Sequence, residues 1–353
     1  MADSPMPTTA DFVLEGGGVR GIGHVGAFTA FAERGITPHR LAGVSAGAIV
    51  GSLLAAGITP ERLHDAYLKQ QYDKLLDPTW IRRLPIPFVN VWASRLFLAG
   101  EYKGVALREW IGARLSDPAL LDGQPPIERW GQLRLDDPGA DTSVVQNGTL
   151  NQLDSHYRLV IVANDVTRGP MMRFPWDYRY WYDLDPDNQS VPDAVYWSTA
   201  IPAFFQPGHL TSHYTGQDSQ MVDGGLSSGF PVDIFDRHDG KPPRWPTFYI
   251  GLQTRLDPRQ PVPNPPRRGL SYYTDSVLSS ALDGRETTLL ADPTLSRREI
   301  LIPANDIDPN DFGISQKRLQ ALFQLGYDTA KTFLDHFSWD AYLGAATTRP
   351  RMP

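Results

Sequence analysis

The chain of 353 residues predicts an α/β fold in which helices flank a central, mainly parallel β-sheet. Short apolar segments, suited to buried strands, alternate with longer helical segments, as in strand–helix–strand units. The first two apolar segments each run into a glycine-containing turn and then a helix. The hydrophobic content of 41% is also sufficient for a large core.

The first predicted unit is a strand over Asp11 to Leu14, followed by the glycine turn Gly16 to Gly21 and a helix. The turn satisfies G-x-G-x-x-G, the fingerprint of dinucleotide binding, which requires an acidic residue about 20 positions further on, at the end of the second strand. The second strand ends instead at Val44 and Ser45, which disfavours a dinucleotide. Backbone N–H groups of the turn are better suited to stabilising an oxyanion.

The second unit carries Ser45 within the G-x-S-x-G pattern Gly43 to Gly47. The apolar residues Leu41 to Val44 predict a strand, and a helix is expected from Ala46. Such a pattern places the serine on a tight strand-to-helix turn that exposes its hydroxyl, a nucleophile elbow. A buried helix start that is rich in small residues has the same letters, so the pattern alone leaves a structural role open.

The third candidate element is Met221 to Gly225, an apolar approach that ends in Asp223 and two glycines. Alone, Asp-Gly-Gly is an ordinary turn. In this order, however, the three elements resemble the patatin-like phospholipase family, and in particular its bacterial type. The resemblance covers roughly residues 11 to 335. It includes three more segments, residues 161–169, 198–205 and 229–232.

The resemblance implies a role for each matching residue. Ser45 would be the nucleophile and Asp223 its partner in a Ser-Asp dyad. The oxyanion loop would consist of Gly16, Gly17, Gly18 and Arg20. The implied chemistry is acyl transfer on a lipid or ester substrate through an acyl-enzyme, with no cofactor and no metal. Two alternatives keep the same fold: a soluble carboxylesterase with the same dyad, and a non-catalytic lipid-binding module.

A Ser-Asp-His triad is a further alternative. In α/β-hydrolases the chain order is serine, acid, histidine, and the serine follows several strands. Ser45 comes too early for that order, although His238 and His336 lie late enough to supply the histidine. His238 lies in a polar turn and His336 near the end of an amphipathic helix, so neither has a recognisable catalytic context.

One domain is expected over residues 11–337, since no internal repeat or linker divides it, with flanking tails at residues 1–10 and 338–353. Residues rich in Pro, Gly, Asp and Asn indicate a surface excursion over Asp117 to Ser155. A proline-rich connection is expected over Pro258 to Pro266 and a last helix over Gln316 to His336.

Composition narrows the function classes further. The absence of cysteine excludes disulfides, thiolate metal sites and a cysteine nucleophile. The net charge of −7 argues against a nucleic-acid partner. The N-terminus has neither the basic nor the apolar region of a secretory signal, so we expect a cytoplasmic protein, peripheral to the membrane at most. The oligomeric state is left open.

Two apolar regions raise the question of membrane contact. Leu41 to Pro60 contains no charged residue, and its length would nominally span a bilayer, but its glycines and serines favour a buried nucleophile helix. Trp80 to Leu98 interleaves aromatic and aliphatic residues with arginines, which suits a lipid interface; a folded flap over the sheet is the alternative. The aromatic run Trp176 to Tyr182 would either line the acyl entrance or pack a long loop.

Overall fold

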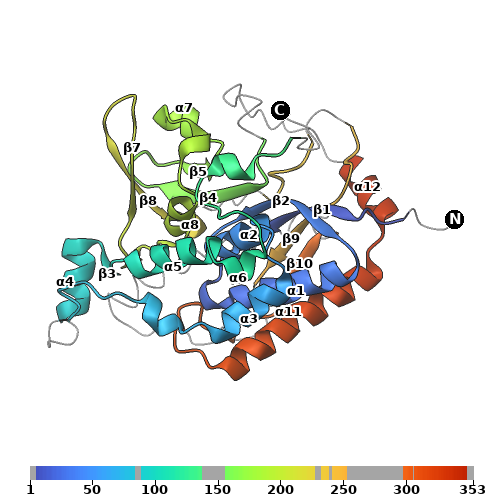
Figure 1. Cartoon of the computed structure of the whole chain (residues 1–353), viewed down its shortest axis with the longest axis horizontal. Coiled ribbons are helices and arrows are strands. Elements are labelled where there is room, and N and C mark those ends of the chain that lie inside the picture. The colour runs from blue at the N-terminus through green and yellow to red at the C-terminus, as the bar shows by residue number, and fades with distance from the viewer. Residues whose placement is uncertain are drawn as a thin grey trace, which may run out of the picture.

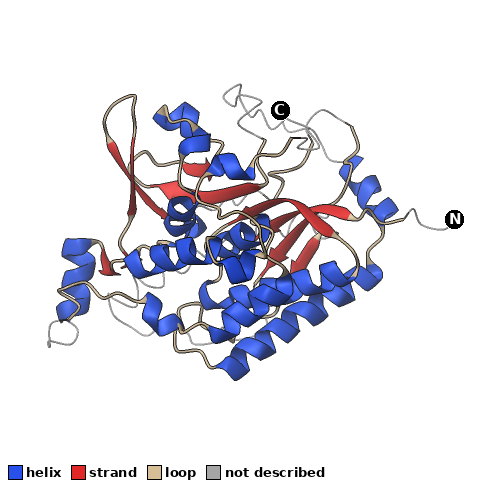
Figure 2. Cartoon of the chain, viewed as in Figure 1, coloured by secondary structure: helices blue, strands red, loops and turns tan. Residues whose placement is uncertain are grey.

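The structure is a computed structural model that describes residues 5–83, 89–136, 156–226, 232–237, 241–252, 297–304 and 306–347. A twisted central sheet runs through the molecule, and helices pack against it (Figure 1; Figure 2). Within these ranges the sheet has eight strands in the order β10-β9-β1-β2-β4-β8-β7, with β5 paired to β4. A separate parallel pair joins β3 to β6.

The direction of the strands confirms the predicted sheet. β10, β9, β1, β2 and β4 are parallel to one another, whereas β5 and β8 join β4 antiparallel and β7 joins β8 antiparallel. The bounds are β1 Thr9–Leu14, β2 Thr37–Gly43, β3 Gly100–Tyr102, β4 Leu159–Asp165, β5 Met171–Phe174, β6 Ala203–Phe205, β7 Gly208–Thr211, β8 Asp218–Asp223, β9 Thr247–Gly251 and β10 Glu299–Leu301.

Two groups of helices accompany the sheet. α1, α3 and α11 contact one another, and α2, α5 and α8 form the second group. The bounds are α1 Ile22–Glu33, α2 Ala46–Ala55, α3 Pro60–Lys69, α4 Val89–Leu98, α5 Val105–Leu115, α6 Pro118–Leu121, α7 Tyr178–Tyr182, α8 Val191–Thr199, α11 Gln316–His336 and α12 Trp339–Thr347. The predicted helices after the glycine turn, after Ser45 and over Gln316 to His336 are thus all present.

α1 and α11 run side by side at very short range (Figure 1). A methyl group added at Gly26 would lie 2.0 Å from the Phe323 carbonyl oxygen, and one added at Gly326 would lie 2.0 Å from the Gly23 oxygen. Only glycine allows this approach of two backbones. Beneath α1, the ring of Phe12 on β1 lies 4.7 Å from the ring of Phe28. α1, the helix that follows the glycine turn, is therefore packed against α11 on one side and against β1 on the other.

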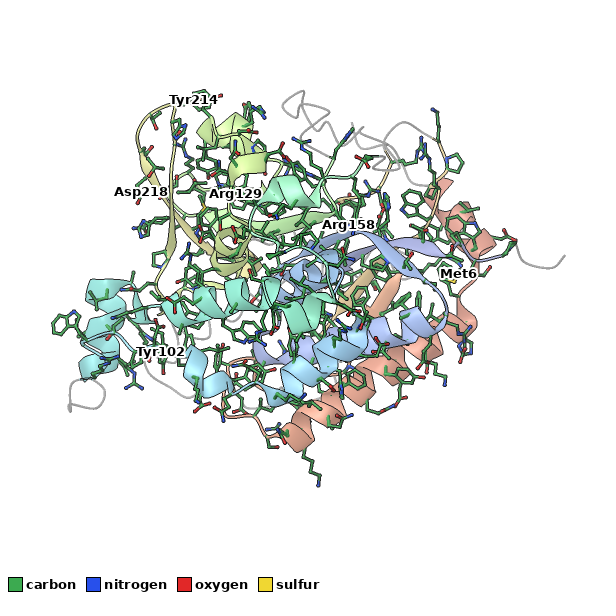
Figure 3. The ribbon with its side chains drawn as sticks, in the orientation of Figure 1. Met6, Tyr102, Arg129, Arg158, Tyr214 and Asp218 are labelled. Carbon is green, nitrogen blue, oxygen red and sulfur yellow. The ribbon has the colours of Figure 1, made fainter. Side chains whose placement is uncertain are left out.

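The structure describes the first part, residues 117–136, of the expected surface excursion over Asp117 to Ser155, and most of these residues are exposed, as expected. The stretch is nevertheless anchored to the core, and Arg129 (Figure 3) forms an isolated bridge with Ser190. Polar turn residues dominate the composition of this stretch, but some of its apolar side chains are buried. The buried ones are Leu121, Ile127, Trp130 and Leu133. Residues 137–155 lie outside the described residues.

The expected tails also need correction. β1 begins at Thr9 and Ala10 is buried, so residues 9 and 10 belong to the sheet. At the other end, α12 lies within the expected tail 338–353, and the hydroxyl oxygen of its Tyr342 accepts a hydrogen bond of 2.9 Å from the Thr247 N–H on β9. The expectation of one domain stays a prediction. Pro258 to Pro266 lies outside the described residues.

The apolar region Leu41 to Pro60 and the aromatic run Trp176 to Tyr182 both fold into the core. Leu41 to Pro60 is divided between the end of β2 and α2, and none of the helices in the described ranges is long and apolar enough to cross a membrane. In the aromatic run, Trp176, Tyr178 and Tyr182 are buried in the core while Tyr180 is exposed. The run therefore packs the short helix α7 onto the sheet, where the second interpretation expected it to pack a long loop.

Candidate active site

Ser45 occupies the turn between β2 and α2 with φ 50° and ψ −119°. A positive φ is rare for a residue with a side chain and costs about 1–3 kcal/mol. The flanking glycines make the turn possible: a methyl group at Gly43 would lie 2.3 Å from the Gly47 oxygen, and one at Gly47 would lie 2.3 Å from the Leu14 oxygen. The strained serine and its two close backbone approaches are the features of a nucleophile elbow.

A hydroxyl from α8 holds this strained turn. The Ser45 N–H donates a hydrogen bond of 2.9 Å to Ser198 Oγ, and Ser198 Oγ–H donates one of 2.6 Å to the Val162 carbonyl oxygen on β4. Ser198 is fully buried. The elbow is therefore tied to the neighbouring strand through one side chain that the sequence analysis did not single out.

The sheet register brings Asp223 to the same end of β4 as Ser45. Gly43 on β2 pairs with Ile161, and Ala163 on the far side of the same strand pairs with Asp223 on β8. A methyl group added at Gly224 would lie 3.0 Å from the Val44 side chain. The turn that carries Asp223 and the turn that carries Ser45 are thus in contact across the end of β4.

Hydrogen bonds to neighbouring residues orient Asp223, which is buried. Its N–H donates to the Ala200 carbonyl oxygen at 2.9 Å, and its own carbonyl oxygen accepts from Asn164 Nδ2 at 2.7 Å. Its Oδ1 accepts from the Gly225 N–H at 2.6 Å. Asn164 and Ser198 are not among the site residues predicted from the sequence, although both lie in segments that carry the family resemblance.

The glycine turn packs directly against the elbow. A methyl group added at Gly16 would lie 3.1 Å from Ser45 Cβ. Gly18 has φ +55°, and a methyl group there would lie 2.0 Å from the Pro309 carbonyl oxygen. In the part of the chain that the structure describes, the N–H groups of Gly17 and Gly18 donate no hydrogen bond. These donors lie in the loop that borders Ser45, where an oxyanion would need them.

Arg20 anchors this loop from within. The residue is buried, its Nε donates to the Gly17 carbonyl oxygen at 3.2 Å, and its Nη1 donates to the Leu252 oxygen at 3.3 Å. The Leu252 N–H in turn donates to Glu15 Oε2 at 2.7 Å. The guanidinium thus connects the glycine turn to the end of β9.

His24, on the first turn of α1, is a titratable group whose pKa is shifted. Burial, together with the nearby charge of Arg20, lowers the pKa of His24 from 6.5 to about 4, against a smaller opposing effect of its hydrogen bond to the Glu15 carbonyl oxygen. The imidazole is therefore neutral at pH 7. It is fully buried.

The histidines considered for a triad receive no support. His336 is exposed at the end of α11, where its Nδ1 lies 2.8 Å from the Thr332 carbonyl oxygen of the same helix. No hydrogen bond or ion pair joins it to Ser45 or Asp223, both of which are described. His238 lies outside the described residues.

Two ion pairs with Glu101 connect the segment Trp80 to Leu98 to the rest of the fold. Arg82 Nε donates to Glu101 Oε2 at 3.1 Å, and Arg95 Nε donates to Oε1 of the same carboxylate at 2.9 Å. Glu101 is buried, Ile81 is buried, and Trp80 is 64% exposed. This region, which includes α4, lies at one end of the molecule (Figure 1). The described part of this segment, called the flap below, is thus anchored to the fold and presents the Trp80 ring to solvent. Its contact with a membrane stays a prediction.

A cavity of about 620 Å³ borders this flap without including the dyad candidates. Its lining comes from the end of α4, from α5, α8 and β7, and from Gln206 and Gln220. Neither Ser45 nor Asp223 lines it. In the described ranges no cluster of histidine and carboxylate side chains could hold a metal ion.

Comparisons with known proteins find a family model, a relative and solved structures that are similar to this chain. The model of the family described as patatin-like phospholipase matches residues 12–236. The uncharacterized protein YqhO of Bacillus subtilis (strain 168) is 31% identical over 333 residues, which are 93% of this chain and 99% of YqhO.

Two solved structures are more distant. VipD from Legionella pneumophila is 19% identical with a TM-score of 0.46, over 93% of this chain and 67% of VipD. A structure of the ExoU–SpcU complex from the type III secretion system of Pseudomonas aeruginosa is 16% identical with a TM-score of 0.43. That match covers 96% of this chain and 52% of the other, so this chain spans about half the length of its counterpart.

Proposed function

Because the chain belongs to the patatin-like phospholipase family, we propose that it is a lipid acyl hydrolase that cleaves carboxylic esters with a Ser45–Asp223 dyad. One observation carries the assignment of residues: the strained Ser45 and the buried Asp223 flank the same end of β4, and their turns are in contact. The glycine turn completes the site from the side of β1, with Gly16 against Ser45.

The proposed reaction has two steps. Ser45 Oγ attacks the ester carbonyl carbon while Asp223 takes the serine proton, and N–H groups of Gly17 and Gly18 stabilise the oxyanion. Collapse of the tetrahedral intermediate expels the alcohol, which leaves with that proton, and an acyl-serine remains. Water then attacks the acyl carbon, Asp223 takes a proton from it, and the carboxylic acid departs as Ser45 regains its hydrogen.

Lipid is the favoured substrate class because the flap supplies an interfacial element. Trp80 is exposed next to the arginines that converge on Glu101. The same segment carries Arg82, Arg83 and Arg95, and basic side chains attract anionic headgroups. Aromatic rings partition to the headgroup level of a bilayer, so Trp80 would dock while the folded part of the flap stays in place.

The assignment is tested with purified protein and two substrates, anionic phospholipid vesicles and a short water-soluble ester. Release of fatty acid from vesicles that is absent in Ser45→Ala supports the lipid acyl hydrolase. Hydrolysis of the soluble ester alone would instead identify a carboxylesterase. Vesicle binding with no hydrolysis of either substrate would identify a non-catalytic lipid-binding protein and overturn the proposal.

The role of the flap is tested separately with Trp80→Ala. We expect weaker vesicle binding and slower vesicle hydrolysis, with the soluble ester unaffected. The matched control is Tyr214→Ala, which removes another exposed ring, 62% accessible, from the tip of the β7–β8 hairpin (Figure 3). If both variants change vesicle binding and vesicle hydrolysis equally, the flap has no specific role in lipid binding.

A further inference from the structure

His24 contacts the peptide that leads into the glycine turn. Its Nε2 lies 2.9 Å from the carbonyl oxygen of Glu15, the residue directly before Gly16. A carbonyl oxygen only accepts hydrogen bonds, so Nε2 must carry the proton. The side chain has no solvent exposure. The histidine is therefore a fixed, neutral donor to one backbone group.

The other ring nitrogen shows that this donor is retained at a cost. Nδ1 of His24 is buried and has no hydrogen-bond partner within the described ranges. In the neutral ring it is a bare acceptor, and burying an unpaired acceptor is unfavourable. Burial also penalises protonation of the ring, as its lowered pKa shows. A side chain that only filled this space would avoid both costs.

The carbonyl that His24 binds lies between the two loops of the site. A methyl group added at Gly47, on the first turn after Ser45, would lie 2.7 Å from the Glu15 oxygen. The Glu15 N–H is also held, by the Ile250 carbonyl oxygen at 3.0 Å. Because a trans peptide is planar, fixing the Glu15 oxygen fixes the Gly16 N–H on its opposite side.

We propose that His24 is a positioning residue of the oxyanion loop: its Nε2–H holds the Glu15 carbonyl oxygen and thereby sets the orientation of the Glu15–Gly16 peptide beside Ser45. This inference rests on the proposed function. Without the donor, the peptide is free to rotate, and the loop N–H groups that follow lose their alignment. Since the oxyanion exists only in the transition state and the intermediates, turnover falls while substrate binding is preserved.

The test compares His24→Leu with His24→Gln on a short water-soluble ester. Leucine fills the space without a donor, whereas the glutamine amide can reach the same carbonyl oxygen. We expect kcat of the leucine variant to fall on the order of tenfold to a hundredfold, below the loss for a whole oxyanion donor, with KM within about twofold. The glutamine variant should recover most of kcat. The matched control is His336→Leu, which removes a histidine bonded to a carbonyl oxygen on α11 and should leave kcat unchanged.

Two results would overturn the role of His24. Wild-type kcat in the leucine variant would show that the bond is dispensable, and equal losses in the leucine and glutamine variants, each shown to be folded by circular dichroism, would show that the donor is not what matters. A crystal structure of His24→Leu gives a readout that needs no activity: we expect a reoriented Glu15–Gly16 peptide, and an unmoved peptide contradicts the inference. If Ser45→Ala kept full activity, the proposed function would fail instead, and the crystal structure would still decide the role of His24.

Discussion

The side chain of Ser198 accepts a hydrogen bond of 2.9 Å from the backbone N–H of Ser45, across 153 positions of sequence. Two residues later in the chain, the Ala200 carbonyl oxygen accepts one from the Asp223 N–H. The end of α8 therefore holds both members of the proposed dyad. This common support explains how a turn with a strained serine keeps its position relative to an aspartate on another strand.

Ser198→Ala should weaken that support. It leaves the buried Ser45 N–H without its partner, which costs about 1–3 kcal/mol, so we expect a lower melting temperature and slower labelling by a serine-directed probe. Ser212→Ala is the matched control, because the Ser212 hydroxyl is fully buried and has no hydrogen-bond partner among the described residues. Equal melting temperatures and labelling rates for the two variants would contradict the supporting role.

Asp223→Asn should reduce turnover by several orders of magnitude, since the carboxylate and the nucleophile act as a unit. Alanine at His238 or His336 should leave turnover near that of the wild type. Steady-state kinetics on the soluble ester, with circular dichroism to verify folding, makes the comparison. A loss of several orders of magnitude in turnover in a folded alanine variant of either histidine would support the triad instead of the dyad.

Gly18→Ala should disrupt the oxyanion loop. The residue has φ +55°, and its new methyl group would lie 2.0 Å from the Pro309 carbonyl oxygen, so the loop has to move. Loss of one oxyanion donor reduces turnover on the order of 10²–10³, and KM should change less. Gly35→Ala is the control, with φ +69° and nothing within 4 Å. An effect on KM alone would make the loop a binding element.

The stability of the protein should depend on pH through His24. Its pKa is 6.5 in the unfolded chain and about 4 in the folded one, so between these values the unfolded state binds the proton more readily. His24 therefore does not change the free energy of unfolding above pH 6.5, and it lowers this free energy as the pH drops toward 4. The full loss is about 3 kcal/mol, at 1.36 kcal/mol per pKa unit. Chemical denaturation of wild type and His24→Gln from pH 7 to pH 4 measures the difference. Parallel pH profiles would contradict the shifted pKa.

Sequence reasoning predicted the elements that local pattern determines. The strand before the glycine turn, the elbow at Ser45 and the approach to Asp223 all follow from short apolar runs that end in small residues, and each is present. The family resemblance supplied the expected roles of Ser45 and Asp223, and the register of β2, β4 and β8 supplied their common location. That register depends on pairing between strands far apart in the chain, which no local pattern encodes.

Long-range contacts also explain what sequence reasoning missed. Nothing in the local sequence distinguishes Ser198 from other serines near a helix end. Its role follows only from the packing of α8 against the elbow. The composition around Trp130 indicated the surface, where most of the described stretch lies, but it did not show that a few apolar side chains anchor the stretch to the core. α12 was expected as a tail because nothing in its own sequence shows that Tyr342 bonds to β9.

The central claim is that Ser45 is the nucleophile. The most direct test is covalent labelling with a fluorophosphonate probe, followed by intact-mass measurement and peptide mapping, on wild type and Ser45→Ala. Removing one oxygen should leave the fold and melting temperature intact. We expect a single phosphonyl group on Ser45 in the wild type, and neither labelling nor ester hydrolysis in Ser45→Ala. A folded Ser45→Ala protein that is still labelled and still hydrolyses esters at the wild-type rate would contradict the account.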